Sequence, residues 1–154
     1  MYVRSVSETD LQTAVAALRD AVEGLIGSGA DLADRPELVD ALDELETVWC
    51  QLPAVRQKLL ARLQVETTAQ EMGAKNWKDV LAIRWRISTR EAHRRLNDAA
   101  LLAPRQPVTG PPLPPLLQVT AVAQEKGVIN GEHVTVIRKA VDKLPGFVDT
   151  VTRE

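Results

Sequence analysis

Seven basic side chains lie within 23 residues of this chain and could do the chemistry of phosphate and base recognition. Between positions 73 and 95 they are accompanied by only two acidic residues, Asp79 and Glu91. A guanidinium can hold a phosphate, or the edge of a guanine, through two hydrogen bonds, so clustered arginines indicate contact with nucleic acid. The basic residues of this stretch are Lys75, Lys78, Arg84, Arg86, Arg90, Arg94 and Arg95.

This local positive charge contrasts with the rest of the chain. The formal net charge is −2, and residues 1–50 carry eleven acidic and three basic residues. Such a balance does not suit a protein that coats DNA over its whole surface, but a basic cluster can create a local positive field. The alternative is that the cluster pairs with the acidic N-terminal helices of the same chain, because domain packing commonly neutralises such patches.

Two short helices joined by a tight turn must position these residues. Asn76 is a good cap for a helix over 77–85, and Ser88 caps a second helix with Glu91 three residues later, which is a capping box. Two helices that cross steeply need small or aliphatic residues on their inner sides. The positions that face inward hold Ala82, Ile87 and Ala92. We therefore predict a helix-turn-helix-like pair over 74–103.

The outward positions of the second helix are the ones that would reach DNA. Arg90, Arg94 and Arg95 would contact phosphate or base edges, and Thr89 would contact phosphate. Arg86 and Lys78 would hold the DNA backbone, although Arg86 stands where turns of this type often have glycine. The predicted DNA-binding residues are Lys78, Arg86, Thr89, Arg90, His93, Arg94 and Arg95.

The remaining sequence predicts helices and no strands, so the fold class is all-α, a multi-helix bundle. Leucine and valine recur every three or four residues over 8–26, where Ser7 would cap the helix and Gly27 would end it in a left-handed turn. Asp34 would cap a long helix over 36–72, kinked or divided at Pro53. Two shorter helices are predicted over 116–126 and from Asn130 to 144. The predicted domains are 1–73, 74–103, 104–115 and 116–154.

Six of the nine prolines fall in 104–115, which predicts an extended linker or surface crossing. A ligand for a proline-recognition domain is the alternative for this segment. The aromatic residues are few, and Trp77 and Trp85 are predicted to anchor the short helices in the core rather than to stack on bases. Residues 147–154 resemble the opening of a further element.

Several classes of function are disfavoured. No apolar run approaches about 18 residues, and the N-terminus lacks the apolar stretch of a signal peptide. The single cysteine, Cys50, excludes an internal disulfide and a cysteine-based zinc site, and His93 and His133 are the two histidines. No phosphate-binding glycine loop or hydrolase motif occurs. We expect a cytoplasmic, non-enzymatic protein without metal, cofactor or membrane association.

A family resemblance covers most of the chain, roughly 36–145. Its parts are Leu-Pro-Ala and Leu-Leu-Ala-Arg-Leu within 52–63, then Ile-Ser-x-x-Glu-Ala-x-Arg-Arg-Leu at 87–96 and Ala-Leu-Leu-Ala at 100–103. After the proline-containing linker come Gly-Val-Ile at 127–129, Glu-His-Val-x-Val-Ile at 132–137 and Leu-Pro at 144–145. In this order the parts resemble the mycobacterial 13E12 repeat family, the actinobacterial domain of unknown function 222.

The resemblance implies a helical region that often precedes an HNH nuclease module, whose paired histidines and cysteine pairs are lacking here. The leading hypothesis is accordingly a DNA-binding accessory region for double-stranded DNA, without nuclease activity of its own and from a mobile-element family. The second hypothesis is a protein-interaction module that forms a homodimer through the leucine-rich helices from Leu38 to Leu63. A third is an inactive, truncated repeat copy.

Overall fold

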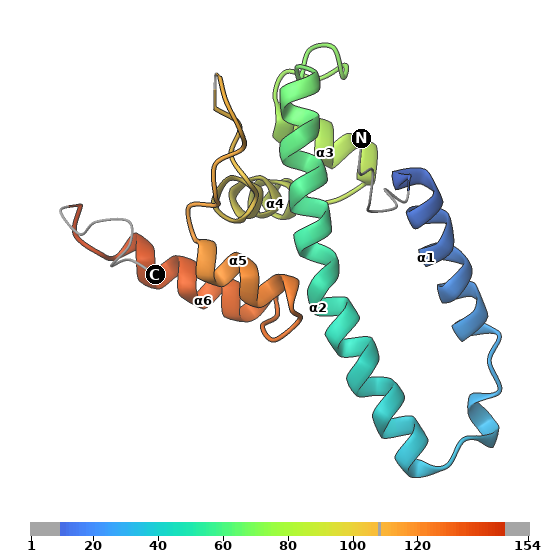
Figure 1. Cartoon of the computed structure of the whole chain (residues 1–154). Helices are drawn as coiled ribbons and strands as arrows, with labels where there is room; N and C mark the ends of the chain where they lie inside the picture. The colour runs from blue at the N-terminus through green and yellow to red at the C-terminus, as the bar shows by residue number, and fades with distance from the viewer. Residues whose placement is uncertain (1–9, 108, 147–154) are drawn as a thin grey trace, which may run out of the picture. The chain divides into compact units, whose positions relative to one another are not determined.

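The protein is described by a computed structural model covering residues 10–107 and 109–146. Over these residues it has six α-helices, one short 3-10 helix and no strand, so the all-α prediction is confirmed (Figure 1). The elements are α1 (Leu11–Ile26), η1 (Ala30–Leu32), α2 (Arg35–Glu66), α3 (Trp77–Trp85), α4 (Thr89–Leu102), α5 (Gln118–Glu125) and α6 (Gly131–Asp142).

The chain divides into two compact units, residues 1–41 and 42–154. The first unit contains α1, η1 and the beginning of α2. Asp10 occupies the N-cap position of α1, and the predicted cap Ser7 lies outside the described residues. Gly27 ends α1 with a φ of −84°, so the predicted left-handed turn is wrong. None of the residues of α1 is buried.

A reciprocal capping box begins α2, as the sequence predicts for Asp34. The Asp34 carboxylate accepts a hydrogen bond from the Glu37 backbone N–H at 3.0 Å, and the Glu37 carboxylate accepts one from the Asp34 N–H at 3.0 Å. The helix runs without a break through Pro53, and it ends at Glu66 rather than near residue 72. Thr68 and Glu71 then form a tight turn, in which the Thr68 N–H donates to the Glu71 carboxylate at 2.8 Å.

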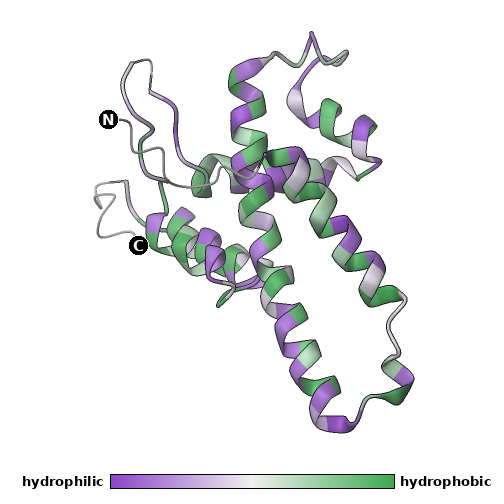
Figure 2. Cartoon of the chain, turned by 45° about the vertical axis from the view of Figure 1, so that its right-hand side comes forward, coloured by the Kyte–Doolittle hydropathy of each residue, from purple (hydrophilic) through white to green (hydrophobic). Residues whose placement is uncertain are grey.

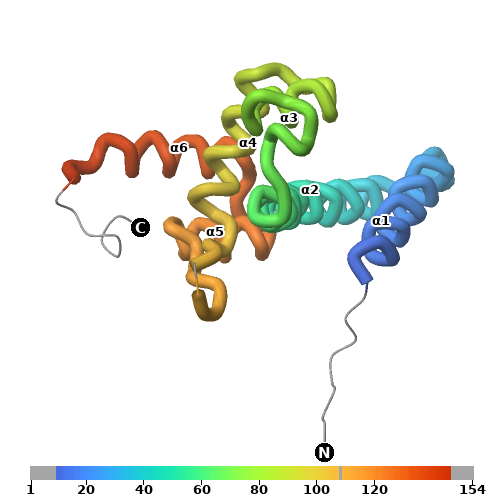
Figure 3. Tube along the Cα trace, turned by 90° about the horizontal axis from the view of Figure 1, so that it is seen from above, coloured from blue at the N-terminus to red at the C-terminus, as the bar shows by residue number. Residues whose placement is uncertain are grey.

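Two groups of buried residues form the core of the second unit, and α4 contributes to both. The first group joins the end of α2 to α3 and α4, through Leu60, Ala69, Val80, Leu81, Ala92 and Ala99. The second joins the end of α4 to α5 and α6, through Leu102, Leu117, Ala121 and Val134. In Figure 3, α4 accordingly runs between α3 and α5. This helix is the axis on which the candidate site is built.

Polar contacts join α5 to α2. The buried Gln57 side-chain amide donates to the side-chain oxygen of Gln124 at 2.9 Å, and Lys58 pairs with Glu125 at 2.7 Å. Gly127 ends α5 with a φ of 74°, as predicted, and approaches the α2 backbone closely. A Cβ at this glycine would lie 2.7 Å from the Thr47 carbonyl oxygen. Only glycine fits here.

The proline-rich segment folds back on itself instead of running as a simple extended linker. Arg105 and Leu113 exchange two backbone hydrogen bonds of 2.9 Å, and the Arg105 guanidinium donates to the Pro114 carbonyl at 2.9 Å. The segment therefore forms a loop between α4 and α5, with three of its six prolines exposed.

Candidate nucleic-acid interface and the neighbouring arginine cluster

The turn between α3 and α4 has the geometry that the caps predict. The Asn76 side chain accepts a hydrogen bond from the Asp79 N–H at 3.0 Å, and the Ser88 hydroxyl accepts one from the Glu91 N–H at 3.1 Å. Arg86 ends α3 in the left-handed conformation with φ 53°, alone among the described non-glycine residues in having a positive φ. A side chain in this conformation is strained, so Arg86 occupies a position that glycine would fit better.

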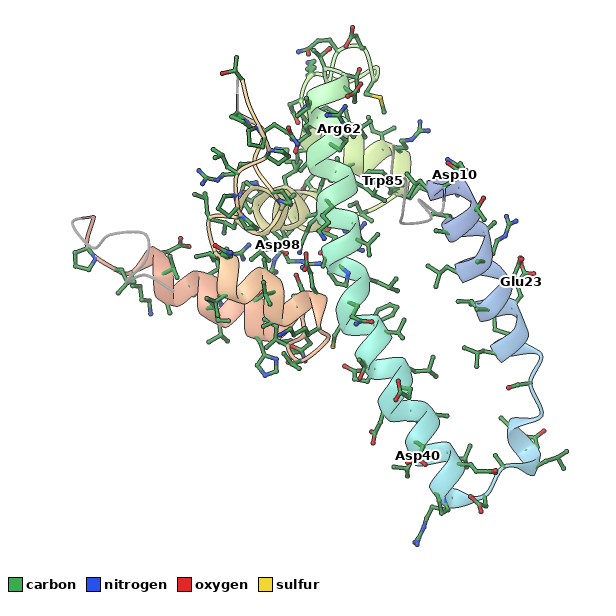
Figure 4. All side chains as sticks on the ribbon, viewed as in Figure 1. Asp10, Glu23, Asp40, Arg62, Trp85 and Asp98 are labelled. Atoms are coloured by element: carbon green, nitrogen blue, oxygen red, sulfur yellow. The ribbon has the colours of Figure 1, made fainter. Side chains whose placement is uncertain are left out.

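The predicted inward residues lie inside. Ala92 is fully buried against the fully buried Leu81, and Ala82 and Ile87 pack on the same core. Trp77 packs there too, as predicted. Trp85, at the end of α3, is 42% exposed, so its predicted role as a core anchor is wrong (Figure 4). Trp85 instead lies beside Arg86 on the surface near the turn.

Five cations near this turn are exposed and make no ion pair with any described residue. They come from the loop before α3, from α3 itself, from the turn and from the first turn of α4: Lys75, Lys78, Arg84, Arg86 and Arg90. The exposed residues also include Thr89 and His93, whose ring lies 3.2 Å from the Asn97 amide nitrogen. These groups are available to a ligand in solution.

Arg94 and Arg95, in contrast, are held by acidic residues of their own helix. Arg94 makes two hydrogen bonds of 2.7 and 2.8 Å to the Glu91 carboxylate and a third of 2.9 Å to Asp98. Arg95 donates to Glu91 at 2.7 Å. Their side chains are 34% and 21% exposed. Arg94 and Arg95 therefore pair with acidic residues of α4. The alternative hypothesis had predicted pairing with the acidic N-terminal helices.

A second-unit cluster thus forms around two carboxylates, and we call it the arginine cluster: Arg56, Glu91, Arg94, Arg95, Asp98 and Arg138. Arg138 of α6 reaches the Asp98 carboxylate at 3.2 Å. Hydrogen bonds from Arg94, and secondarily from Arg95, lower the pKa of Glu91 to about 2 against the opposing effect of burial. Burial raises the pKa of Asp98, partly offset by Arg94 and Arg138. Asp98, labelled in Figure 4, lies on α4 among the side chains of neighbouring helices.

Only one of the two hydrogen bonds of the predicted capping box at Ser88 is formed. The Ser88 hydroxyl binds the Glu91 N–H, but the Glu91 carboxylate binds Arg94 and Arg95 instead of returning to the Ser88 backbone. A complete box occurs at α6, where Asn130 accepts from the His133 N–H at 3.1 Å and His133 Nδ1 accepts from the Asn130 N–H at 3.2 Å. His133 therefore has a capping role in the first turn of α6.

A shallow groove of about 430 Å³ lies between the N-terminal half of α4 and α6. Arg90, His93 and Asn97 line it from α4, and Thr135 and Lys139 line it from α6. Lys139 is exposed, so α6 places one more cation beside the outward side of α4.

Residue spacing alone could have shown part of the arginine cluster. Glu91 precedes Arg94 and Arg95 by three and four residues, and Asp98 follows Arg94 by four, which are the spacings at which helical side chains meet. Arg138 lies 40 residues from its partner Asp98, and Arg56 comes from another helix. No local signal marks these two residues.

The second unit is a helical domain whose family the comparisons define. A family model described as a domain of unknown function (DUF222) matches residues 39–154. The chain belongs to this family, which confirms the resemblance to domain of unknown function 222.

Several curated relatives come from Mycobacterium tuberculosis. Uncharacterized protein MT1160 of strain CDC 1551 is 41% identical over 145 residues, which cover 94% of this chain and 34% of the relative. Uncharacterized protein Rv1702cMb1728c of strain H37Rv is 43% identical over 119 residues, 77% of this chain and 26% of the relative. Uncharacterized protein Rv3466 of the same strain is 43% identical over 103 residues, 67% of this chain and 46% of the relative.

The chain spans about a third of the length of the first of these relatives. No solved structure matches it. Among the described residues, none of the helices has the length and apolar character needed to cross a membrane, and no group of three or more metal-binding side chains comes together.

Proposed function

We propose that this chain is a DNA-binding helical module that holds duplex DNA through α3, the following turn and the first turn of α4. One observation carries the proposal: five exposed cations, carried by α3, the residues on either side of it and the first turn of α4, have no acidic partner among the described residues. Cations without partners are free to neutralise phosphates and release counterions, which is the main source of non-specific affinity for DNA.

The proposal divides the seven predicted residues into two groups. Lys78, Arg86, Thr89, Arg90 and His93 are exposed and would touch the DNA. Arg94 and Arg95 would act indirectly, because their hydrogen bonds to Glu91 already occupy part of each guanidinium. Substituting Arg94 or Arg95 would destabilise the fold, because Glu91 would lose its hydrogen-bond partners. Such variants would therefore not be a clean test of DNA contact.

The test is a titration of fluorescent duplex DNA at several salt concentrations. The variant Arg86→Gly with Arg90→Ala removes two free charges, and glycine suits the left-handed turn. We expect its binding to weaken at every salt concentration and the slope of log K against log salt to fall by about 2, roughly one unit for each phosphate contact. The matched control is Lys126→Ala with Lys143→Ala, two exposed cations at the ends of α5 and α6, and it should bind like the wild type.

Two results would contradict the proposal. One is the absence of binding by the wild-type chain at low ionic strength. The other is an equal loss of DNA affinity in the α3–α4 variant and in its control. Such a result would mean that net charge alone explains the binding.

A binding role without catalysis, and association with an HNH nuclease in a mobile-element family, remain part of this proposal and rest on the sequence resemblance. Cytoplasmic location also stays a prediction from sequence. So does the alternative of an inactive repeat copy, which a cooperative thermal transition together with DNA binding would contradict.

A second candidate function is self-association, and a specific observation favours it. None of the α2 residues before Cys50 is buried, and the apolar side chains Leu38, Leu42 and Leu45 are between 41% and 64% exposed. An apolar stripe on α1 is exposed in the same way, at Leu11, Val15, Leu18, Val22 and Leu25. A second copy of the chain carries the same apolar stripe on α2, and such stripes pack on one another in helical dimers. We therefore propose a second copy of this chain as the occupant of these surfaces.

A further inference from the structure

A cleft in the second unit lies beside the arginine cluster and has no part in the proposed DNA contact. Its volume is about 800 Å³, which is in the range of sites for small ligands. The middle of α2 forms one wall with Trp49, Pro53 and Arg56, and α4 and the start of α6 form the others with Arg94 and Gly131.

Arg56 differs from the other guanidiniums of the arginine cluster in its lack of a partner. It makes no ion pair or hydrogen bond with any residue that the structure describes, although it is partly buried. Burial, together with the like charges of Arg95 and Arg94, lowers the pKa of Arg56. An unpaired, partly buried cation beside two others is unfavourable, and a bound anion would offset that cost.

The charge balance of the cluster also favours an anion. Its four guanidiniums are accompanied by two carboxylates, Glu91 and Asp98, so two positive charges remain uncompensated. Glu46 and Glu132 also line the cleft, but both side chains are exposed, so water screens their charges. The less exposed arginines would therefore attract an anion more strongly than these two carboxylates repel it.

Two further features fit the rest of a ligand. Trp49 is 70% exposed, so the cleft has an indole available for stacking on a planar ring. Arg94 Nη1 lies 4.0 Å from the place where a Cβ on Gly131 would be, so a guanidinium and the first residue of α6 are neighbours with little between them. The missing side chain at Gly131 therefore leaves the cleft open next to Arg94, whose guanidinium is held by Glu91 and Asp98.

We propose that this cleft binds a nucleotide, with the phosphates held by Arg56 and the base stacked on Trp49. The inference is independent of DNA binding, because it uses α2 and α6 and none of the five free cations of the α3–α4 turn.

Calorimetric titration of the full chain with ADP, inorganic pyrophosphate and adenosine tests the proposal. We expect ADP to bind more tightly than pyrophosphate, and adenosine alone to bind too weakly to measure. Arg56→Met should raise the dissociation constant for ADP by about tenfold or more, since it removes a charge-assisted contact. Trp49→Leu should weaken ADP binding and leave pyrophosphate binding unchanged. Glu132→Gln should strengthen the binding of both ADP and pyrophosphate by removing an exposed carboxylate from the cleft.

The matched control is Arg62→Met, which removes a guanidinium from the same helix outside this cleft. Its partner Glu66 is exposed, so the loss should not affect the fold or ADP binding. Circular dichroism should show that Arg56→Met is folded and at least as heat-stable as the wild type, because no partner is lost. If Arg56→Met does not fold, Arg56→Lys replaces it, since lysine keeps the charge, loses bidentate contact and should weaken ADP binding.

Three results would overturn the proposal: no ADP binding by the wild type, undiminished binding by the folded Arg56 variant, or equal affinity for ADP and pyrophosphate. Loss of ADP binding in the Arg86→Gly and Arg90→Ala variant would also overturn it, because the ligand would then belong to the DNA-contacting surface.

Discussion

At the scale of single residues, Glu91 decides which arginines of α4 are free. Its carboxylate receives hydrogen bonds from both Arg94 and Arg95, and Asp98 takes a further bond from Arg94. Arg90, one residue before Glu91, has no partner among the described residues. Arg94 and Arg95 therefore stabilise the fold, whereas Arg90 remains available for binding.

The low pKa of Glu91 makes this cluster sensitive to acid. Its pKa in the folded protein is about 2, below the ordinary value of 4.5, so the ionised form contributes stability above pH 4.5 and loses it as the pH falls towards 2. We predict that Glu91→Gln lowers the free energy of unfolding at pH 7 by about 1–2 kcal/mol, less than the full shift implies because the group is partly exposed. The difference from the wild type should shrink below pH 4.5.

Urea unfolding at a series of pH values measures this effect. Glu66→Gln is the control, because its ion pair with Arg62 is exposed and should change stability by less than about 0.5 kcal/mol. Equal stabilities of wild type and Glu91→Gln at pH 7 would show that the Glu91 ion pairs do not support the fold.

At the scale of elements, α4 has three tasks along its length. Its inner side joins both buried groups of the core, its middle carries the arginine cluster, and its first turn presents Arg90 beside the strained Arg86. Local features mark both ends of the helix, namely the Ser88 cap at its start and the Ala103 N–H, which donates to the Ala99 carbonyl at 3.0 Å, at its end. One helix therefore couples the candidate sites to the stability of the core.

The link between α5 and α6 depends on one glycine. Gly127 combines a positive φ of 74° with a backbone contact to Thr47, so Gly127→Ala should introduce both strain and a clash. We predict a loss of roughly 2–4 kcal/mol in unfolding free energy, measured by urea denaturation. Gly73→Ala is the matched control: its φ is 82° but no atom lies within 4 Å, and it should cost only about 1 kcal/mol. Equal losses in the two variants would mean that the approach to Thr47 has no energetic importance.

At the scale of the whole molecule, the burial of apolar side chains differs between parts of the chain. The second unit buries leucine, valine and alanine in two groups around α4, whereas α1 buries none of its side chains. Figure 2 shows apolar and polar residues alternating along α1 and the first half of α2, the pattern of helices that pack on others. Large exposed apolar stripes mark interaction surfaces, which is the physical basis for proposing self-association.

Light scattering of the purified chain tests this proposal directly. We predict that the wild-type chain is a stable dimer. The double variant Leu42→Asp with Leu45→Asp should be a monomer, because two charges on the α2 stripe of each copy would have to be buried in the interface. Glu44→Gln, an exposed residue of the same helix, is the control and should remain dimeric. A wild-type monomer at high protein concentration would remove self-association as a function and leave the apolar stripes to another partner.

The caps and periodicities in the sequence were sufficient to predict most helices. Asp34, Asn76, Ser88 and Asn130 each begin a helix where predicted, because a cap is satisfied by backbone groups two or three residues away. The predicted end of α2, near residue 72, depends on Gly73 as the stop, whereas Thr68 and Glu71 already bond each other in a turn after Glu66. The prediction that Trp85 lies in the core depends on residue type alone, and type does not determine which side of a short helix is covered.

The helical fold class, the tight turn at Arg86 and the local pairing of Arg94 and Arg95 with acidic residues of α4 can all be predicted from the sequence, because they depend on neighbours within about four positions. The rest of the arginine cluster depends on tertiary packing. Packing of α6 on α4 brings Arg138 to Asp98 across 40 residues of sequence, and α2 places Arg56 beside Arg94 and Arg95 without an acidic partner. Burial and charge pairing at such distances arise from how helices pack, and local sequence does not encode that packing in a readable form.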